Sequence, residues 1–550
     1  MEDFIFGTLA TDELKHTYYR TEKLGIRHAY NIHPKAPKQN EPITLNVEIG
    51  PDLFVDQVAC YYTNDGSNPE GSRGNSPNGK VVYFSRKDIE WDTLTWGYRS
   101  RWEAQLPPQS ETKQLKYIIS GWTGEGQEYY ADFPDIKLTI EKYAKYYFDG
   151  KPLPQMTPSG NPQKPTLFQI DIDPYSVPDW LHESIIYHIF VDRFFPGKDR
   201  NWIQDQNLEK PFGGTLWGIA DKMDYLFDLG ITTLWLSPIL PSPTIHRYDA
   251  TNYFHVADEL GGDQALHDLV RKAHDHGIRI ILDLVCNHIS SEHPYFKQAL
   301  SNPNSKYRNW FYFDEEDQPG YRTFFGVEAM PQLNLDHPEA RQWMFEIAEY
   351  WINEFNIDGY RLDHAMGPGP GFWNDFWTIC KKEKADSVCI GEVVEPPDVQ
   401  RQFYGKMDGL LDFHLCEAIR RSIGYNNWSK SRYLNFITNH FGFFPEDYVL
   451  ASFLDNHDMD RFSFVTKNDK DQLKKAAEIQ FDLPGPPIIY YGTEAGLQQR
   501  ISKTTQVGLE ASRGPMPWDG KQDKDLLAFY RDLIKKRKES KPWINRKRQR

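Results

Sequence analysis

Eight short apolar runs alternate with helical patterns over the larger, C-terminal part of this chain, and this alternation restricts the fold more than any other feature. The runs lie at 185–191, 231–236, 278–285, 357–362, 388–391, 407–411, 449–454 and 487–490. Helical periodicity between them is clearest at 217–229, 264–276, 338–354, 371–384, 470–481 and 523–538. Strands that alternate with helices are typical of parallel sheets, and eight such units predict an α/β fold of the (β/α)8 barrel type. A doubly wound open sheet is the alternative from the pattern alone.

The remaining segments suggest how the domains are organised. Residues 1–140 carry short alternating runs separated by Gly, Asn, Ser and Pro clusters, and we expect an all-β sandwich there. A stretch without periodicity, 141–180, is predicted to be a linker. The catalytic barrel should cover 181–540, with a small lobe inserted after the third strand at about 286–337, because a loop that long is usually functional. Residues 541–550 form a basic tail.

Aromatic residues make up 15% of the chain, which suits either a large core or a surface on which flat rings stack against sugars. Four tryptophans of the N-terminal domain are candidates for either role: Trp91, Trp96, Trp102 and Trp122. For each of them taken singly, a place in the core is the simpler expectation.

Charge and cysteine usage exclude several classes of protein. The formal net charge of −15 argues against a nucleic-acid partner, which requires a basic surface. Five scattered cysteines without CxxC spacing indicate free thiols in a reducing compartment rather than disulfides or a zinc site. The sequence shows no signal peptide and no apolar run long enough to span a membrane. We therefore expect a cytoplasmic protein with no membrane partner.

Acidic residues lie near the C-terminal ends of four of the predicted strands. Asp283 lies in the third run, Asp363 ends the fourth, Glu392 follows the fifth, and Asp458 follows the seventh. The C-terminal ends of barrel strands meet on one face, where barrel enzymes carry their catalytic groups. Four such coincidences on one face predict an active site built from carboxylates.

The chemistry that fits this pattern is glycoside hydrolysis or transfer with retention. Retaining enzymes need an ionised carboxylate as nucleophile and a protonated carboxylic acid about 5–5.5 Å away. We assign Asp363 as the nucleophile and Glu392 as the acid/base, because repulsion from Asp363 and Asp458 favours the protonated form of Glu392. Arg361 points to the same side of its strand as Asp363 and should keep it ionised. Taken alone, the Arg361–Asp363 pair is more simply a structural ion pair than a catalytic centre.

At this point the chain resembles the α-amylase superfamily over roughly 185–540. It carries the motifs DLVCNH (283–288), GYRLD (359–363), GE (391–392) and NHD (456–458) in order, with GITTLWLSPI (230–239) and GTEAG (492–496) beside them. The resemblance implies that Asp458 is a third catalytic carboxylate that holds sugar hydroxyls. It also implies that Arg361, His288 and His457 line the site, that Tyr248 stacks on the sugar, and that Asp283 is mainly structural.

The segment MPQLN (330–334) looks like a motif of the cyclomaltodextrinase, neopullulanase and maltogenic amylase branch. An N-terminal β-sandwich is also typical of that branch, in which it often pairs with a second subunit. The resemblance therefore implies short α-glucans or cyclodextrins as substrates and a homodimer as a candidate assembly.

The sequence departs from the family pattern in three places. The segment after the nucleophile is His364–Pro370. Beyond His364 it contains no His or Lys, which many starch-cleaving members place there. The calcium loop of the branch is replaced by Phe195–Lys198, and its companion acidic position is Thr215, so that calcium site is predicted to be lost. Asn287 remains a candidate ligand for a structural calcium, although the chemistry needs no cofactor. The C-terminal β-domain usual in the family is expected to be missing.

Three functions remain open on this reading. The first is a retaining α-glucan hydrolase, and the second is a 4-α-glucanotransferase or α-glucosidase with the same residues. The third is a non-catalytic sugar-binding relative, which would be expected to have lost a catalytic carboxylate, whereas Asp363, Glu392 and Asp458 are all present.

Overall fold

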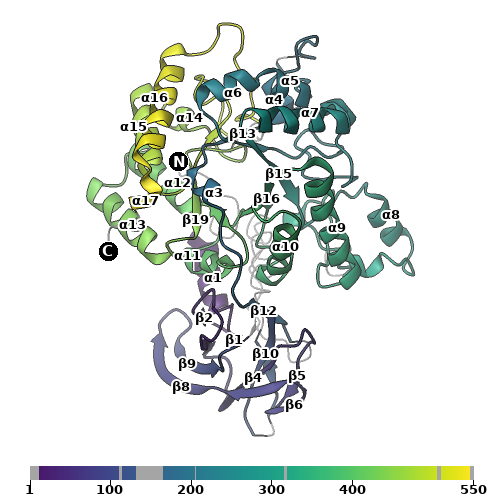
Figure 1. Ribbon diagram of the computed structural model, residues 1–550. Coiled ribbons are helices and arrows are strands. Elements are labelled where there is room, and N and C mark those ends of the chain that lie inside the picture. The colour runs from purple at the N-terminus through teal and green to yellow at the C-terminus, as the bar shows by residue number, and fades with distance from the viewer. Residues whose placement is uncertain are drawn as a thin grey trace.

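A closed barrel of eight parallel strands lies at the centre of the molecule (Figure 1). The computed structural model describes residues 12–110, 114–124, 126–131, 165–204, 206–314, 319–503 and 510–545. Around the barrel the strands follow chain order: β13 (Ile186–Ile189), β14 (Thr233–Leu236), β15 (Arg279–Val285), β16 (Gly359–Asp363), β17 (Val388–Gly391), β18 (Gly409–Leu411), β19 (Val449–Phe453) and β20 (Pro487–Tyr490). Each strand begins and ends within two residues of its predicted run, so the predicted barrel is confirmed.

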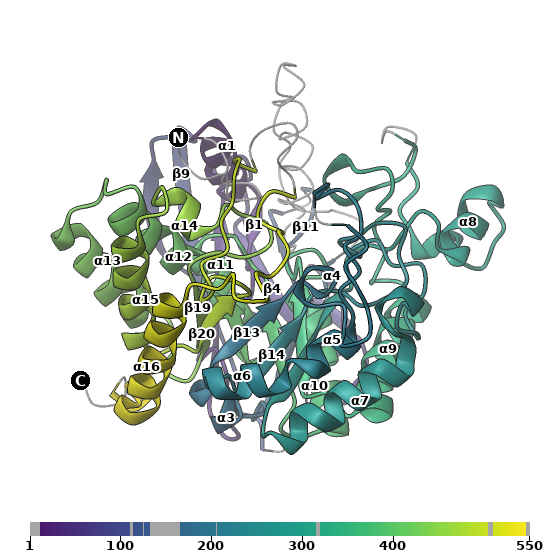
Figure 2. The same cartoon turned by 90° about the horizontal axis from the view of Figure 1, so that it is seen from above.

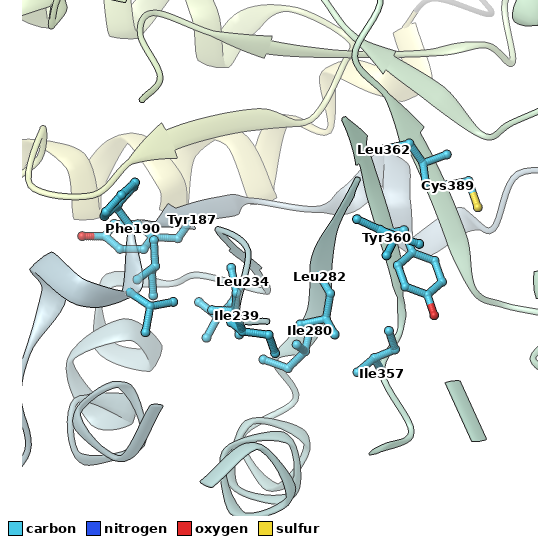
Figure 3. Close-up of a cluster of buried hydrophobic side chains, with 14 of the residues drawn as sticks. Tyr187, Phe190, Leu234, Ile239, Ile280, Leu282, Ile357, Tyr360, Leu362 and Cys389 are labelled. Atoms are coloured by element: carbon cyan, nitrogen blue, oxygen red, sulfur yellow. The ribbon is translucent and has the colours of Figure 1, made fainter. Parts of the chain in front are cut away.

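The barrel strands are buried on both faces, which explains why their sequences are almost continuously apolar. The side chains that fill the inside of the barrel include Ile186, Trp235, Ile281, Ile390, Val449 and Ile488. Outward-facing side chains pack beneath the helices, and Figure 3 shows members of this layer from five successive strands: Tyr187, Leu234, Leu282, Tyr360 and Cys389.

Helices surround the barrel, with α7, α9 and α10 on one side and α15 and α16 on the other (Figure 2). The main helices are α5 (Leu216–Asp221), α6 (Met223–Leu229), α7 (Gly262–Asp275), α9 (Pro338–Phe355), α10 (Pro370–Glu383), α12 (Phe413–Ile419), α13 (Lys430–Phe443), α15 (Lys470–Asp482) and α16 (Lys524–Ser540). The helix predicted at 217–229 is two helices, because Lys222 leaves helical geometry with φ −99° and ψ 14°. Within the described ranges, no helix is long and apolar enough to cross a membrane.

Short segments complete the barrel domain. They are α3 (Asp179–Glu183), α4 (Val191–Phe194), η1 (Asp258–Leu260), α11 (Pro397–Gln400), η4 (Arg401–Phe403), η5 (Arg420–Gly424), α14 (Phe462–Val465) and α17 (Pro542–Asn545). The lobe inserted between β15 and α9 contains α8 (Pro294–Ser301), η2 (Arg308–Trp310) and η3 (Phe324–Gly326). Isolated bridges such as His288↔Gln332 join the lobe to the end of β15, so the lobe lies beside the mouth of the barrel.

The N-terminal domain consists of two facing antiparallel sheets. One sheet contains β1 (Ile26–Arg27), β2 (Ile32–His33), β3 (Ile43–Ile49), β8 (Ser85–Asp92) and β9 (Gly97–Leu106). The other contains β4 (Gln57–Thr63), β7 (Lys80–Tyr83), β10 (Gln114–Trp122), β11 (Tyr129–Tyr130) and β12 (Phe168–Asp171), and a small hairpin pairs β5 (Glu70–Ser72) with β6 (Asn75–Asn78). Buried side chains of both sheets, among them Val47, Cys60 and Ile119, form one core.

The predicted β-sandwich is present and is preceded by helix α1 (Asp12–Glu22). One expectation for this region needs correction. The predicted linker 141–180 contains β12, which pairs with β10, since its Phe168 and Ile170 complete the sandwich core. Residues 141–164 of that linker, and 546–550 of the basic tail, lie outside the described residues.

The four tryptophans of this domain divide into two pairs. Trp102 and Trp122 are buried, in agreement with a core role. Trp91 and Trp96 are 47% and 77% exposed, and their rings meet edge to face at the tip of the β8–β9 hairpin with centroids 5.3 Å apart. Tyr98 joins them 5.1 Å from Trp91. These three rings form an exposed aromatic cluster at the tip of the hairpin.

Candidate active site

Three carboxylates predicted from separate strand ends line one cavity at the mouth of the barrel. Asp363 is the last residue of β16, Glu392 follows β17, and Asp458 follows β19. All three border a cavity of about 230 Å³. Because β16 and β17 are neighbouring parallel strands, their C-terminal ends bring Asp363 and Glu392 to adjacent positions on the cavity floor.

Arg361 connects the carboxylates below the cavity. Its Nη1 donates to Asp283 Oδ1 at 2.7 Å and to Asp363 Oδ1 at 2.9 Å. Its Nη2 lies 2.7 Å from Glu392 Oε1. The side chain is 1% exposed, so these charges interact away from bulk water. One guanidinium thus ties together the predicted nucleophile, the predicted acid and the strand-three aspartate.

Opposing effects act on the charge of Asp363. Burial raises the pKa of Asp363 well above its ordinary value; Arg361 opposes this, whereas Glu392, Asp283 and Asp458 add to it. Crowding of carboxylates around one cation favours a proton on one of them. The assignment of Asp363 as an ionised nucleophile stays a prediction.

Asp458 lies in the opposite electrostatic environment. Burial opposes its charge, but His457, Arg513 and Lys503 overcome that effect and lower the pKa of Asp458 well below its ordinary value. His457 Nε2 lies 2.8 Å from Asp458 Oδ2, and Arg513 Nη2 donates to Asp458 Oδ1 at 3.1 Å. These neighbours therefore favour the ionised form of Asp458, which lies at the edge of the cavity and is suited to accept hydrogen bonds from hydroxyl groups.

Tyr248 links these two halves of the site. Its hydroxyl donates to Asp283 Oδ2 at 2.9 Å and lies 2.6 Å from His457 Nε2. Its ring stacks on the His457 ring, with centroids 5.3 Å apart and an interplanar angle of 5°. Tyr248 borders the cavity, whereas Asp283 does not and is 4% exposed. Asp283 thus acts by holding Arg361 and Tyr248.

The wall beside Glu392 comes from the inserted lobe and is largely apolar. His288 borders the cavity and stacks on Phe324 with centroids 4.5 Å apart. Phe325 and Met330 extend this wall. His364 meets both phenylalanines edge to face, at 4.8 and 5.4 Å, and its backbone N–H donates to Glu392 Oε2 at 3.0 Å. The segment after the nucleophile therefore contacts both the acid and the lobe.

Two glycines in this region have packing roles. A Cβ at Gly367 would lie 1.9 Å from Asn287 Oδ1, so only glycine allows the chain to cross there. A Cβ at Gly391 would lie 2.5 Å from Met407 Sδ. The position of a Gly391 side chain is thus filled by Met407 and Leu410 rather than facing the cavity.

The candidate calcium ligand Asn287 is already engaged. Gln332 Nε2 donates to its Oδ1 at 3.2 Å, and its backbone carbonyl accepts from Leu333. Among the described residues, no group of three or more His, Cys, Asp or Glu side chains is arranged to hold a metal ion. The assignment of Asn287 as a calcium ligand stays a prediction.

A buried arginine lies just before Phe195–Lys198, the loop where the branch's calcium site is predicted to be lost. Arg193 is fully buried and donates to the carbonyls of Arg513, Leu208 and Lys210 at 2.9, 2.7 and 3.3 Å. These bonds join the segment after β13 to the segment after β20.

Several residues of the site were not predicted from the sequence. Arg513 comes from a non-periodic segment after the last strand, and Phe324 and Phe325 come from the lobe. None of these segments has a pattern that fixes which side chain turns inward. Trp235 was visible in a quoted motif, but its donation to Asp283 Oδ2 at 3.1 Å depends on strand register, which the sequence does not give.

Known proteins match the chain mainly over the barrel. The profile of the family described as "Alpha amylase, catalytic domain" matches residues 188–525. The chain is 44% identical over 373 residues to "Alpha-amylase 2" of Dictyoglomus thermophilum, a match that covers 67% of this chain and 65% of that protein. It is 34% identical over 393 residues to a cyclomaltodextrinase of Geobacillus thermopakistaniensis, covering 68% and 65%. The chain thus spans 65% of the length of these curated relatives. A solved cyclomaltodextrinase is similar over 94% of this chain and 84% of its own, with a TM-score of 0.63 and 25% identity.

Proposed function

Because the chain belongs to the alpha-amylase catalytic-domain family, we propose that it hydrolyses α-glucosidic bonds, mainly α-1,4, with retention of the anomeric configuration. The observation that carries the proposal is the contact of one guanidinium with two carboxylates. Arg361 holds Asp363 at 2.9 Å through Nη1 and Glu392 at 2.7 Å through Nη2. Two adjacent nitrogens of one planar group favour the short separation, about 5–5.5 Å, of retaining enzymes.

In the first step Glu392 donates its proton to the glycosidic oxygen while the Asp363 carboxylate forms a bond to the anomeric carbon. The bond from that carbon to the glycosidic oxygen breaks, and the leaving sugar departs as an alcohol. In the second step water attacks the same carbon and gives a proton to Glu392, and the bond to Asp363 breaks. Glu392 must therefore give up its proton in the first step and recover one in the second.

Arg361, Asp458 and His457 would stabilise the transition state. Arg361 must balance the charge of Asp363 before attack, and its contact with Glu392 keeps the acid oriented. Asp458, kept ionised by its basic neighbours, would accept hydrogen bonds from sugar hydroxyls as the ring distorts. The hydroxyl group and the aromatic ring of Tyr248 would contact the same sugar.

We propose short malto-oligosaccharides and cyclodextrins as the substrates. The cavity of about 230 Å³ is small compared with typical ligand pockets, which suits one sugar unit at the point of cleavage. The similarity to proteins named cyclomaltodextrinase supports the same substrate class. Five buried free cysteines support the prediction that this activity is cytoplasmic.

Transfer to an acceptor sugar is the second candidate function. Phe324, Phe325 and Met330 make the wall beside Glu392 apolar, so a sugar face can displace water there. Water and a sugar compete for the same covalent intermediate. Incubation with maltotriose distinguishes the outcomes, because transfer gives products longer than the substrate and hydrolysis gives only glucose and maltose.

The main test is the pair of variants Glu392→Gln and Asp363→Asn, assayed on maltotriose. Each should lose at least about a thousandfold in kcat, because each step needs both groups. Glu383→Gln, an exposed glutamate of α10, is the matched control and should remain active. Proton NMR of the first product should show the α-anomer. Undiminished activity of Glu392→Gln, or a β-anomer as first product, would exclude this mechanism.

For the N-terminal domain we propose a role in glucan binding or in pairing with a second subunit. The exposed cluster of Trp91, Trp96 and Tyr98 supports a contact function. Replacing both tryptophans with alanine should weaken retention in a glycogen-containing gel if the cluster binds glucan, or lower the mass in solution if it joins subunits.

A further inference from the structure

A buried histidine lies beneath the catalytic carboxylates and takes no part in the chemistry proposed above. His188 is in β13, where it is the register partner of Trp235 in β14, and it is 0% exposed. The two rings stack with centroids 3.6 Å apart and an interplanar angle of 7°. This is close, nearly parallel contact, so the imidazole fixes the plane of the indole.

Trp235 carries this constraint to the catalytic cluster in two ways. Its Nε1 donates to Asp283 Oδ2 at 3.1 Å, and Asp283 Oδ1 in turn accepts from Arg361 Nη1 at 2.7 Å. The Arg361 guanidinium also lies over the indole, 5.2 Å from its centroid. A tilt of the indole would therefore move both the partner of Arg361 and the surface on which Arg361 rests.

The edge of the stack reaches the other half of the site. The His188 ring meets the His457 ring at 80° with centroids 5.1 Å apart. His457 contacts the hydroxyl group of Tyr248 and Asp458. His188 thus touches both the Trp235–Arg361 branch and the His457–Asp458 branch through ring contacts, as Tyr248 does from the cavity side.

The surroundings of His188 indicate that its ring acts by packing rather than by hydrogen bonding or charge. Burial, with His457 and Arg361 nearby, lowers the pKa of His188 well below its ordinary value, so the ring is neutral. Neither ring nitrogen has a hydrogen-bond partner among the residues that the structure describes. Buried polar atoms without partners cost stability, and an apolar ring would avoid that cost. The neutral, flat five-membered ring fits where a cation would repel Arg361.

We propose that His188 is a positioning residue that acts through Trp235 to aim Arg361 at Asp363 and Glu392. This proposal rests on the proposed function, because the retaining reaction defines the position that Arg361 must hold. A small change in the angle of a guanidinium that contacts both carboxylates should affect the bound transition state more than ground-state binding.

Three variants test this assignment on maltotriose. His188→Ala removes the stack and should lower kcat about tenfold to a hundredfold, with KM within about twofold of wild type. His188→Phe keeps a flat ring and should recover kcat to within about threefold. Trp235→Phe keeps the stack but removes the donor to Asp283, and it should show a loss similar to that of His188→Ala.

Two further readouts separate positioning from a general loss of packing. If both residues act through Arg361, the losses of His188→Ala and Trp235→Phe should not add in the double variant. The acid limb of the kcat/KM profile should also move upward in His188→Ala, because a misdirected Arg361 stabilises the Asp363 charge less. Circular dichroism and melting of each variant show whether the protein is folded, and His188→Phe serves where His188→Ala does not fold.

The outcomes are distinguishable from failure of the proposed function. Glu392→Gln, measured in the same series, tests the reaction itself. Full activity of this variant would contradict the proposed function. If Glu392→Gln is inactive while His188→Ala keeps kcat and its acid limb, the positioning role is overturned and the function stands. Additive losses in the double variant would overturn it as well.

Discussion

Replacing Arg361 with methionine should shift the pH dependence of catalysis upward. The guanidinium lies 2.9 Å from an oxygen of Asp363 and is 1% exposed. Two unit charges about 4 Å apart at an effective dielectric constant of about 20 interact by about 4 kcal/mol. Since one pKa unit corresponds to about 1.4 kcal/mol, loss of this cation should raise the pKa of Asp363 by roughly 2 to 3 units. The nucleophile would then be charged only at higher pH.

The assay is the pH profile of kcat/KM on maltotriose, because its limbs report groups of the free enzyme. In Arg361→Met the acid limb should move up by roughly 2 to 3 units, and activity at neutral pH should fall at least about a hundredfold. Arg361→Lys keeps the charge but has one nitrogen for three carboxylates, so its shift should be smaller.

The control and the refuting result follow from the barrel geometry. Arg279→Met removes an arginine at the opposite end of β15, where it contacts Asp358 at 3.1 Å and Asp386 at 3.0 Å. It should leave the acid limb unchanged. An acid limb in Arg361→Met within about half a pH unit of wild type would refute the view that Arg361 holds Asp363 ionised.

Two other perturbations test the surroundings of the site and the barrel. Gly367→Ala should lower kcat about tenfold or more, because its Cβ would lie 1.9 Å from Asn287 Oδ1 beside the cavity. Gly442→Ala is the control, because an added Cβ there meets nothing within 4 Å. Equal kcat values for the two variants would contradict the proposed clash. Burial opposes the charge of Asp358, but a hydrogen bond from His274 at 2.8 Å helps to lower the pKa of Asp358 below its ordinary value. Its stabilising effect should be complete above the unfolded pKa of about 3.9 and be lost as pH falls through the folded value. Melting curves should therefore show a lower Tm for Asp358→Asn at pH 7 and a much smaller difference near pH 3, and a pH-independent difference would contradict the assignment.

The barrel could be predicted because its strands are buried on both faces. A strand such as β16 (Gly359–Asp363) is apolar between its ionisable positions whatever its exact register, and the chain repeats that signal eight times. The elements that escaped prediction depend on contacts far away in the sequence. Strand β12 (Phe168–Asp171) is four residues long and exists because β10 offers it an edge. The helix break at Lys222 is likewise a matter of packing.

The site divides in the same way between strand ends and loops. Asp363 and Glu392 follow predictable strands, and the geometry of any parallel barrel brings such positions together. Arg513 and Phe324 belong to irregular segments, in which no periodicity indicates the direction of a side chain. His188 is on a predictable strand but escaped attention because a buried histidine has many structural explanations.

The electrostatic division of the site is the feature that sequence reasoning could least supply. Arg361 beside Asp363 predicts an ionised carboxylate, but burial of Asp363, with Glu392 and Asp283 close by, raises its pKa despite Arg361. Asp458 has the opposite surroundings, because His457, Arg513 and Lys503 lower its pKa despite burial. The first arrangement favours a retained proton, whereas the second favours a charged carboxylate. Two carboxylates on strands and a third near a basic loop can thus perform different tasks with the same functional group.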